Sequence, residues 1–347
     1  MLAFGLYSHI RANRIRTGLL LLCFAATVSM IFYSVCIIRE LFDYPDSLRE
    51  LLLDALDLFI EDGPWLIIGM GVWFIAMILW HHKVLDAATG AKDVAREEEP
   101  RLYVMLETLC ISRGMITPHL KIIESDALNA YAAGLVEDDY CIALTRGLIN
   151  TLTAQELESV IAHELTHIRN RDAQMMVVAT VFVGFIGMIA STIMNHWDLI
   201  YRELLHKAKR EETEKPSWLI VVIGLAIAIL VAALSWGLSV LIRFAISRKR
   251  EYLADAGAVE LTKDPDALIR ALRKIEGHAE IAQVAPKARA FFIETPAPGG
   301  TQGWFATHPT INERVAALVN FAGGRDIEKP SAATQAQRMV WRLQSKA

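Results

Sequence analysis

The stretch that decides the fold is His163-Glu164-Leu165-Thr166-His167. Residues four positions apart on a helix share one face, so His163 and His167 would direct two imidazoles at one point. A single metal ion requires this convergence of ligands. Glu164 lies beside them, where its carboxylate can accept a proton. The spacing therefore predicts a helix that carries a metal site with an adjoining general base.

The residues around this stretch also favour a helix. Thr153 precedes Glu156 by three positions, which is the spacing of a capping box. An apolar stripe at helical spacing follows: Leu157, Val160, Ile161, Leu165 and Ile168. The five letters form the H-E-x-x-H pattern of zinc peptidases, in which the two histidines bind the metal. The competing interpretation is a helix with two incidental surface histidines.

The composition restricts the class of protein. The 347 residues are enough for two structural units. The chain is 54% hydrophobic, which is high for a soluble protein, and its net charge of −4 does not indicate a nucleic-acid partner. The cysteines show no C-x-x-C spacing, so we expect neither a disulfide framework nor a thiolate metal site. They are Cys23, Cys36, Cys110 and Cys141.

Four runs without a charged side chain have lengths suited to crossing a bilayer, at residues 17–38, 63–80, 175–194 and 217–242. A cleaved signal peptide is the competing interpretation of the first run. That run is long for a signal peptide and lacks a clear small-residue cleavage site, so we expect a retained anchor. The pattern predicts an integral membrane protein with four transmembrane helices.

Residues 39–62 carry eight acidic side chains and two arginines, and we expect them to form an external loop. Within this loop, Ser47 and Glu50 have capping-box spacing and open an amphipathic stretch from Leu48 to Ile60. Two interpretations remain open: a short helix on the membrane surface, or an ordinary solvated helix.

Basic residues predict the orientation, because they flank the cytoplasmic ends of membrane helices. The N-terminus and the segments after the second and fourth runs are basic. Four crossings then place the N-terminus, the soluble parts and the C-terminus in the cytoplasm. The segment 195–216 would be external, although it carries five basic residues beside five acidic ones. This segment is the weakest part of the predicted topology.

Two separated segments, 84–172 and 243–321, have the composition of one soluble domain that is α+β and mainly α. Residues 101–112 have helical periodicity, whereas 120–124 and 140–144 are typical of short strands. Residues 322–347 form a polar, basic tail. The pair His81-His82 ends the second apolar run. Adjacent histidines on a helix should not face one metal, so we interpret the pair as a polar boundary.

A third metal ligand is required beside two histidines and a water. Glu251 is the candidate, and Asp255, one turn on, would accept the free ring N–H of a ligating histidine. The competing interpretation of Glu251 is a surface charge among basic neighbours. The third run begins eight residues after His167 and the fourth ends nine residues before Glu251, so both would stand roughly 12–14 Å from the membrane. Glu260 is the next candidate, at 18 residues from that boundary.

His308 lies in the stretch Thr307-His308-Pro309-Thr310. A histidine late in a chain usually has a structural role. It would alternatively donate a hydrogen bond to the oxyanion that forms when water attacks a carbonyl. The residues alone leave both interpretations open.

Four motifs together resemble those of the HtpX-type membrane zinc peptidases, relatives of the CAAX prenyl protease. They are LNAYAAG, HELTH, SRKREYLAD and THPTINER. The resemblance covers roughly residues 84–321 and the four-span layout. It implies a zincin fold of the glutamate-ligand type, with one zinc ion per subunit and Glu164 as general base. The implied zinc ligands are His163, His167 and Glu251, with Asp255 behind them.

The resemblance also implies a substrate site. In that family, the stretch that matches Asn129-Ala130-Tyr131 is an edge strand that pairs with the substrate backbone, and the histidine matching His308 assists at the transition state. Tyr131 is a departure, because the family usually has phenylalanine at this position.

The sequence as a whole predicts a multi-pass zinc endopeptidase of the bacterial inner membrane, with its active site facing the cytoplasm. The resemblance implies protein substrates, chiefly misfolded or damaged membrane proteins in quality control and the stress response. Two alternatives remain. A CAAX-type prenyl-protein processing peptidase would require more membrane helices, and a non-catalytic zinc-binding membrane scaffold would not require Glu164.

Overall fold

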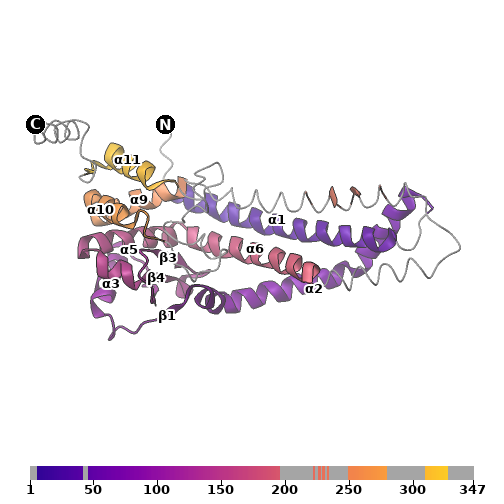
Figure 1. Cartoon of the computed structure of the whole chain (residues 1–347), viewed down its shortest axis with the longest axis horizontal. Coiled ribbons are helices and arrows are strands. Elements are labelled where there is room, and N and C mark those ends of the chain that lie inside the picture. Colours follow the sequence, from indigo (N-terminus) through magenta and orange to yellow (C-terminus); the bar gives the residue numbers. More distant parts are fainter. Residues whose placement is uncertain are drawn as a thin grey trace, which may run out of the picture. The chain divides into compact units, whose positions relative to one another are not determined.

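The computed structural model describes residues 6–41, 46–195, 249–279 and 309–326, with isolated positions between 222 and 233. The chain divides into two compact units (Figure 1). A helical unit comprises residues 1–85 and 174–246, and a sheet-containing unit comprises residues 86–173 and 247–347. These divisions fall near the predicted boundaries between the apolar runs and the soluble segments.

The helical unit contains α1 (Leu6–Glu40), most of α2 (Leu48–Thr89) and most of α6 (Asp172–Asn195). Within the described residues, two stretches are long and apolar enough to cross a membrane: Thr17–Glu40 and Leu48–Thr89. They contain the first two predicted runs. The third run lies in α6, and most of the fourth lies outside the described residues. Phe24 of α1 stacks on Phe182 of α6 with ring centroids 4.1 Å apart.

The segment predicted to be an external loop is mostly helical. Residues 48–62 form the start of α2, which continues through Pro64 although proline cannot donate the usual helical hydrogen bond. Leu51 and Ala55 are fully buried in a cluster with Ile37 of α1. The apolar face of the amphipathic stretch therefore packs against another helix. Sequence reasoning missed this use because the partner lies elsewhere in the chain.

The sheet-containing unit is built on four strands in the order β1-β2-β4-β3. Their bounds are Ala91–Asp93 for β1, His119–Ile123 for β2, Ala130–Ala133 for β3 and Cys141–Thr145 for β4. The pair β2 and β4 is parallel, whereas β1–β2 and β3–β4 are antiparallel. The strands β2 and β4 confirm the two predicted from sequence, each within one residue. Among the described strands, β3 lies at an edge of the sheet.

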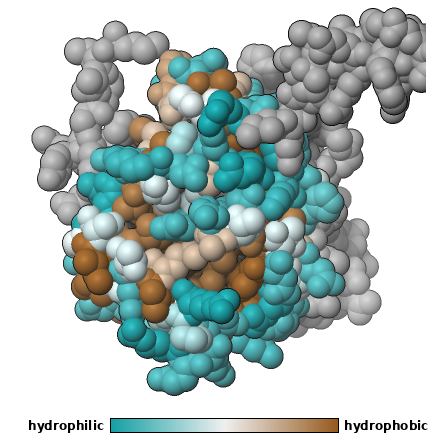
Figure 2. Space-filling model, turned by 90° about the vertical axis from the view of Figure 1, so that its left-hand side faces the viewer, coloured by the Kyte–Doolittle hydropathy of each residue, from teal (hydrophilic) through white to brown (hydrophobic). Residues whose placement is uncertain are grey.

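Six α-helices complete the described part of this unit, together with a 3-10 turn at Glu137–Asp139. They are α3 (Pro100–Arg113), α4 (Arg146–Thr151), α5 (Ala154–Arg169), α9 (Lys249–Thr262), α10 (Pro265–Ile275) and α11 (Ile311–Ala322). The main core includes Leu106 of α3, Ile142 of β4 and Ile161 of α5. The surface in Figure 2 shows separate apolar areas among hydrophilic residues. The described residues are thus mainly α with one small sheet.

Candidate active site

The helix α5 begins at a fixed point because its N-terminus is capped in both directions. The side chain of Thr153 accepts a hydrogen bond from the amide of Glu156, and the Glu156 carboxylate accepts one from the amide of Thr153. Lys274 and Arg270 of α10 pair with the same carboxylate at 2.7 and 3.4 Å. This confirms the predicted capping box and sets the phase of the helix that carries both histidines.

Three predicted ligands converge in the interior of this unit. Nε2 of His163 lies 3.1 Å from Nε2 of His167. Oε2 of Glu251, from α9, lies 3.6 and 3.8 Å from these two nitrogens. One donor atom from each residue falls within 4.8 Å of the others, and this grouping is suited to a metal ion.

Two carboxylates orient the imidazoles. Nδ1 of His163 lies 3.0 Å from Oδ1 of Asp255, and Nδ1 of His167 lies 3.0 Å from Oδ2 of Asp172. Carboxylates accept hydrogen bonds, so each Nδ1 is held as a donor, and Nε2 of each ring is the atom left to bind a metal. The tautomer that metal binding requires is therefore set by residues behind the rings.

Arg314 of α11 holds Asp255 in place. Its Nε and Nη2 donate to the two carboxylate oxygens of Asp255 at 2.9 and 2.6 Å. Burial raises the pKa of Asp255, but Arg314 and His163 outweigh burial and hold this pKa below its usual value. Asp255 thus remains a charged acceptor although only 2% of its surface is exposed.

The electrostatics of the site favour a positive charge between the ligands. Burial lowers the pKa of His167, but Asp172 and Glu251 outweigh burial and raise this pKa to about 10. For Glu164, burial raises the pKa and outweighs the opposing effect of the two histidines. A carboxylate with a raised pKa is a better proton acceptor. The donor set therefore fits a cation, and Glu164 fits a base beside it.

Small residues bring α9 close enough to α5 for Glu251 to reach the histidines. Ala254 and Ala258 are fully buried. A Cβ added to Gly257 would lie 2.4 Å from Cγ2 of Thr166, so only glycine fits this close crossing. The other candidate ligand, Glu260, pairs with Arg113 of α3 at 2.9 Å and is not among the grouped donors.

The structure brings only some of the predicted residues to this cluster. His308 lies outside the described residues. The Asn129 side chain donates to the carbonyl of Ala279 at 2.9 Å and accepts from the amide of Ala130 at 3.0 Å. The Tyr131 side chain is fully buried. The side chains of Asn129 and Tyr131 therefore make contacts inside the protein.

Sequence reasoning gave no role at the metal site to Asp172 or Arg314. Asp172 follows the end of α5, and it returns to His167 because Arg171 adopts a positive φ of 61°. Arg314 lies in the motif THPTINER, 151 residues from His163. The motif could have pointed to Arg314. No sequence pattern indicated the backbone reversal that brings Asp172 to His167.

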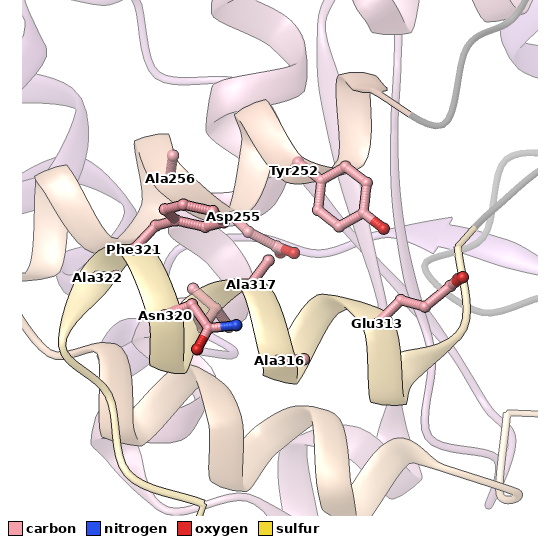
Figure 3. A pocket seen from close by; sticks show the side chains of 10 residues that line it. Tyr252, Asp255, Ala256, Glu313, Ala316, Ala317, Asn320, Phe321 and Ala322 are labelled. Atoms are coloured by element: carbon pink, nitrogen blue, oxygen red, sulfur yellow. The ribbon is translucent and has the colours of Figure 1, made fainter.

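A pocket of about 520 Å³ lies between α9 and α11 (Figure 3). Asp255 lines it together with Tyr252, Phe321 and several alanines. None of the three grouped donors lines this pocket. The described part of α9 thus contributes Glu251 to the grouped donors and borders a mainly apolar pocket through Tyr252.

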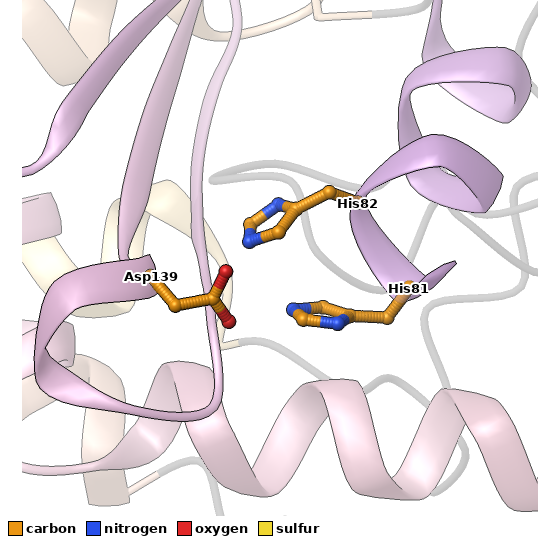
Figure 4. A group of neighbouring side chains, drawn as sticks. All are labelled: His81, His82 and Asp139. Carbon is orange, nitrogen blue, oxygen red and sulfur yellow. The ribbon is translucent and has the colours of Figure 1, made fainter. Parts of the chain in front are cut away.

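The arrangement of His81 and His82 differs from the expectation that adjacent histidines on a helix should not face one metal. Their ring centroids lie 4.1 Å apart although the residues are adjacent on α2 (Figure 4). Nδ1 of His81 lies 2.9 Å from the carbonyl oxygen of Ile78. Adjacency therefore does not keep these two rings apart. Asp139, also drawn in Figure 4, belongs to the sheet-containing unit.

Residues 96–322 match the family model described as peptidase family M48, and this span is more than half of the chain. The chain belongs to peptidase family M48. The predicted resemblance is therefore confirmed. With its two long apolar helices, this M48 chain is a membrane-bound metalloprotease.

Two bacterial relatives of this M48 chain are similar over most of their length. A "Protease HtpX homolog" from Bacteroides fragilis (strain YCH46) is 40% identical over 327 residues, covering 91% of this chain and 99% of that protein. A "Protease HtpX homolog" from Listeria monocytogenes serotype 4a (strain HCC23) is 32% identical over 321 residues, with the same coverage. The crystal structure of Ste24p from S. mikatae matches with a TM-score of 0.44 and 19% identity, over 76% of this chain and 60% of that one. Neither alternative function is favoured by these matches.

Proposed function

We propose that this M48 chain is a zinc-dependent endopeptidase, in which His163, His167 and Glu251 bind one zinc ion per subunit. Ligand atoms about 2.0–2.1 Å from a tetrahedral zinc lie about 3.3 Å from one another. The three separations of 3.1, 3.6 and 3.8 Å lie around this value. Two imidazole nitrogens and one carboxylate oxygen are also the donors that zinc takes in catalytic sites.

Glu164 is the proposed general base. When bound, zinc lowers the pKa of a water ligand and polarises the scissile carbonyl. Glu164 accepts the proton of the attacking water and delivers it to the leaving amine. The burial that raises its pKa supports this role, because it makes the carboxylate readier to hold a proton. His308 is the proposed donor to the oxyanion, on the grounds of its motif.

The substrate is proposed to bind as an added strand along Asn129, Ala130 and Tyr131. Backbone groups alternate in direction along an antiparallel strand. The backbone carbonyl of Asn129 accepts from the amide of Thr145 in β4, so the backbone groups of Ala130 and Ala132 point away from β4. The Asn129 side chain already binds the amide of Ala130. Ala130 and Ala132 are buried, with 0% and 6% of their surfaces exposed, so a peptide would pair with the Ala130 carbonyl and both groups of Ala132 once this edge is uncovered.

The proposed setting is the bacterial inner membrane, crossed four times, with the zinc site on the cytoplasmic side. Four apolar runs and the basic flanks support this topology. Misfolded or damaged membrane proteins are the proposed substrates, because pairing through backbone atoms gives affinity with little sequence selectivity.

The substitution Glu164→Gln tests the proposed mechanism. It removes the base but leaves all three ligands, so casein cleavage should fall to background while the zinc content stays at the wild-type value. Glu158→Gln, on the same helix, is the matched control and should cleave normally. Equal loss of zinc and activity in Glu164→Gln would show that this carboxylate has another role.

A further inference from the structure

One face of the sheet carries a row of aligned residues. The strand registers place Asp93, Lys121, Ala143 and Tyr131 directly opposite one another across β1, β2, β4 and β3. Their chain neighbours Ile122, Ala130, Leu144 and Ile142 point to the other face and join the core with α5. Lys121, Ala143 and Tyr131 are buried. The row therefore belongs to a covered face that the proposed mechanism does not use.

The last turn of α2 lies against this row. Its residues Asp86 and Thr89 belong to the sheet-containing unit and stand one turn apart. Oδ2 of Asp86 lies 2.6 Å from Nζ of Lys121, and Oγ1 of Thr89 lies 3.2 Å from the hydroxyl oxygen of Tyr131. The single helical turn thus reaches β2 and β3 while crossing β4 at Ala143.

The small Ala143 permits this arrangement. Strands β2 and β3 flank β4, so the anchored residues are about 10 Å apart across the sheet. A larger side chain at position 143 would lift the turn away from both partners. Gly90 ends the helix at a φ of 76°, and the amide of Ala91 then donates to Oγ1 of Thr89 at 3.3 Å. Thr89 therefore contacts both Tyr131 and the start of β1.

Tyr131 stands between Ala130 and Ala132, whose backbone groups point away from β4. A rotation of β3 about its own axis would redirect the groups of Ala130 and Ala132 together. The buried phenol, held at its far end by Thr89, opposes that rotation. Burial raises the pKa of Tyr131, so the phenol stays neutral and keeps its hydroxyl proton for hydrogen bonding.

We propose that Thr89 and Tyr131 are positioning residues, whose hydroxyl pair fixes the edge strand β3 in the orientation that receives a substrate backbone. The inference rests on the proposed function, because it takes β3 as the substrate-binding strand. The HtpX-type family usually has phenylalanine at the position that matches Tyr131. The hydroxyl pair is therefore a departure of this chain from the family motif.

The experiment measures peptide cleavage by the zinc-loaded full-length protein in detergent, with a casein-derived fluorogenic peptide. Thr89→Val keeps the shape of the side chain but removes the hydroxyl. It should raise KM about threefold to tenfold, the effect of losing one buried hydrogen bond, with kcat within about twofold and zinc content unchanged. Tyr131→Phe should act in the same direction, and the conservative Thr89→Ser should behave as wild type.

The double variant Thr89→Val/Tyr131→Phe tests whether the two residues act through one contact. Its KM should rise no further than in the single variants, because both changes remove the same hydrogen bond. An unchanged KM in Thr89→Val, with only a lower thermal midpoint, would overturn the proposal and leave the pair a purely stabilising role. Multiplying effects on KM would likewise contradict it. Glu164→Gln, measured alongside, separates the two claims. If it is inactive while Thr89→Val matches wild type, the endopeptidase function stands and the positioning role falls.

Discussion

Asp172 shows how one residue outside a motif can determine what the motif does. It lies beyond the end of α5, yet its carboxylate reaches Nδ1 of His167 at 3.0 Å. The positive φ of Arg171, which a non-glycine residue rarely adopts, turns the chain back toward the ring. His163 has a corresponding partner in Asp255, itself held by Arg314. Both ligand rings are thus oriented by buried carboxylates.

Replacing Asp172 should therefore weaken metal binding without removing a ligand. Asp172→Asn keeps the size of the side chain. Its neutral amide accepts a weaker hydrogen bond from Nδ1 of His167 than the carboxylate does. We expect zinc affinity to fall about 10–100-fold, measured by competition with a chromogenic chelator. Asp138→Asn, at an exposed position in the same unit, is the control. Wild-type affinity in Asp172→Asn would mean that the His167 ring is oriented by other contacts.

At the scale of elements, the site depends on the crossing of α5 and α9. The sequence gives each helix its own signals, but their separation depends on Gly257 facing Thr166. Gly257→Ala should push α9 away from α5 and carry Glu251 out of reach of the histidines. We expect a clear loss of zinc affinity and a lower thermal midpoint in Gly257→Ala.

A second substitution tests this explanation. Thr166→Ser removes Cγ2, the nearest atom to the added Cβ, while its hydroxyl can still donate to the carbonyl of Ala162. Combined with Gly257→Ala, it should restore part of the lost zinc affinity. If Gly257→Ala binds zinc normally, or if Thr166→Ser gives no recovery, the close crossing does not place Glu251.

Local patterns predicted the parts of the fold that depend on neighbouring residues. The capping box of Thr153, the helix near 101–112 and the strands β2 and β4 are set by nearby residues, and all are present. Contacts distant in sequence could not be found in this way. The packing of Leu51 on α1 and the reach of Arg314 to Asp255 depend on elements whose arrangement no local pattern specifies. The convergence of His163, His167 and Glu251 was predicted from membrane spacing and the motifs together.

At the scale of the whole molecule, the group formed by His163, His167 and Glu251 imposes a condition on the membrane topology. His167 and Glu251 belong to one unit, yet residues 174–246 between them belong to the other. If α6 and the fourth apolar run both cross the membrane, the segment 195–216 must lie on the opposite side from the metal site. The five basic residues of this segment oppose an external position, so its location is the point of the topology to test.

Cysteine labelling in intact cells tests this placement. In a background without the four native cysteines, Lys207→Cys should react with a membrane-impermeant maleimide, whereas Glu158→Cys should react only after the cells are lysed. Protection of both positions in intact cells would show that the two runs do not both cross. The hairpin would then be re-entrant or interfacial.

The zinc content of two glutamate variants shows whether Glu251 is the third metal ligand. Glu251→Gln and Glu260→Gln change the same residue type on the same helix, but only Glu251 faces the two histidines, whereas Glu260 pairs with Arg113. Each purified protein would be dialysed against a weak chelator and its zinc measured by mass spectrometry. We expect about one zinc per chain for wild type and Glu260→Gln, and a value near zero for Glu251→Gln. A full complement of zinc in Glu251→Gln would contradict this assignment of Glu251.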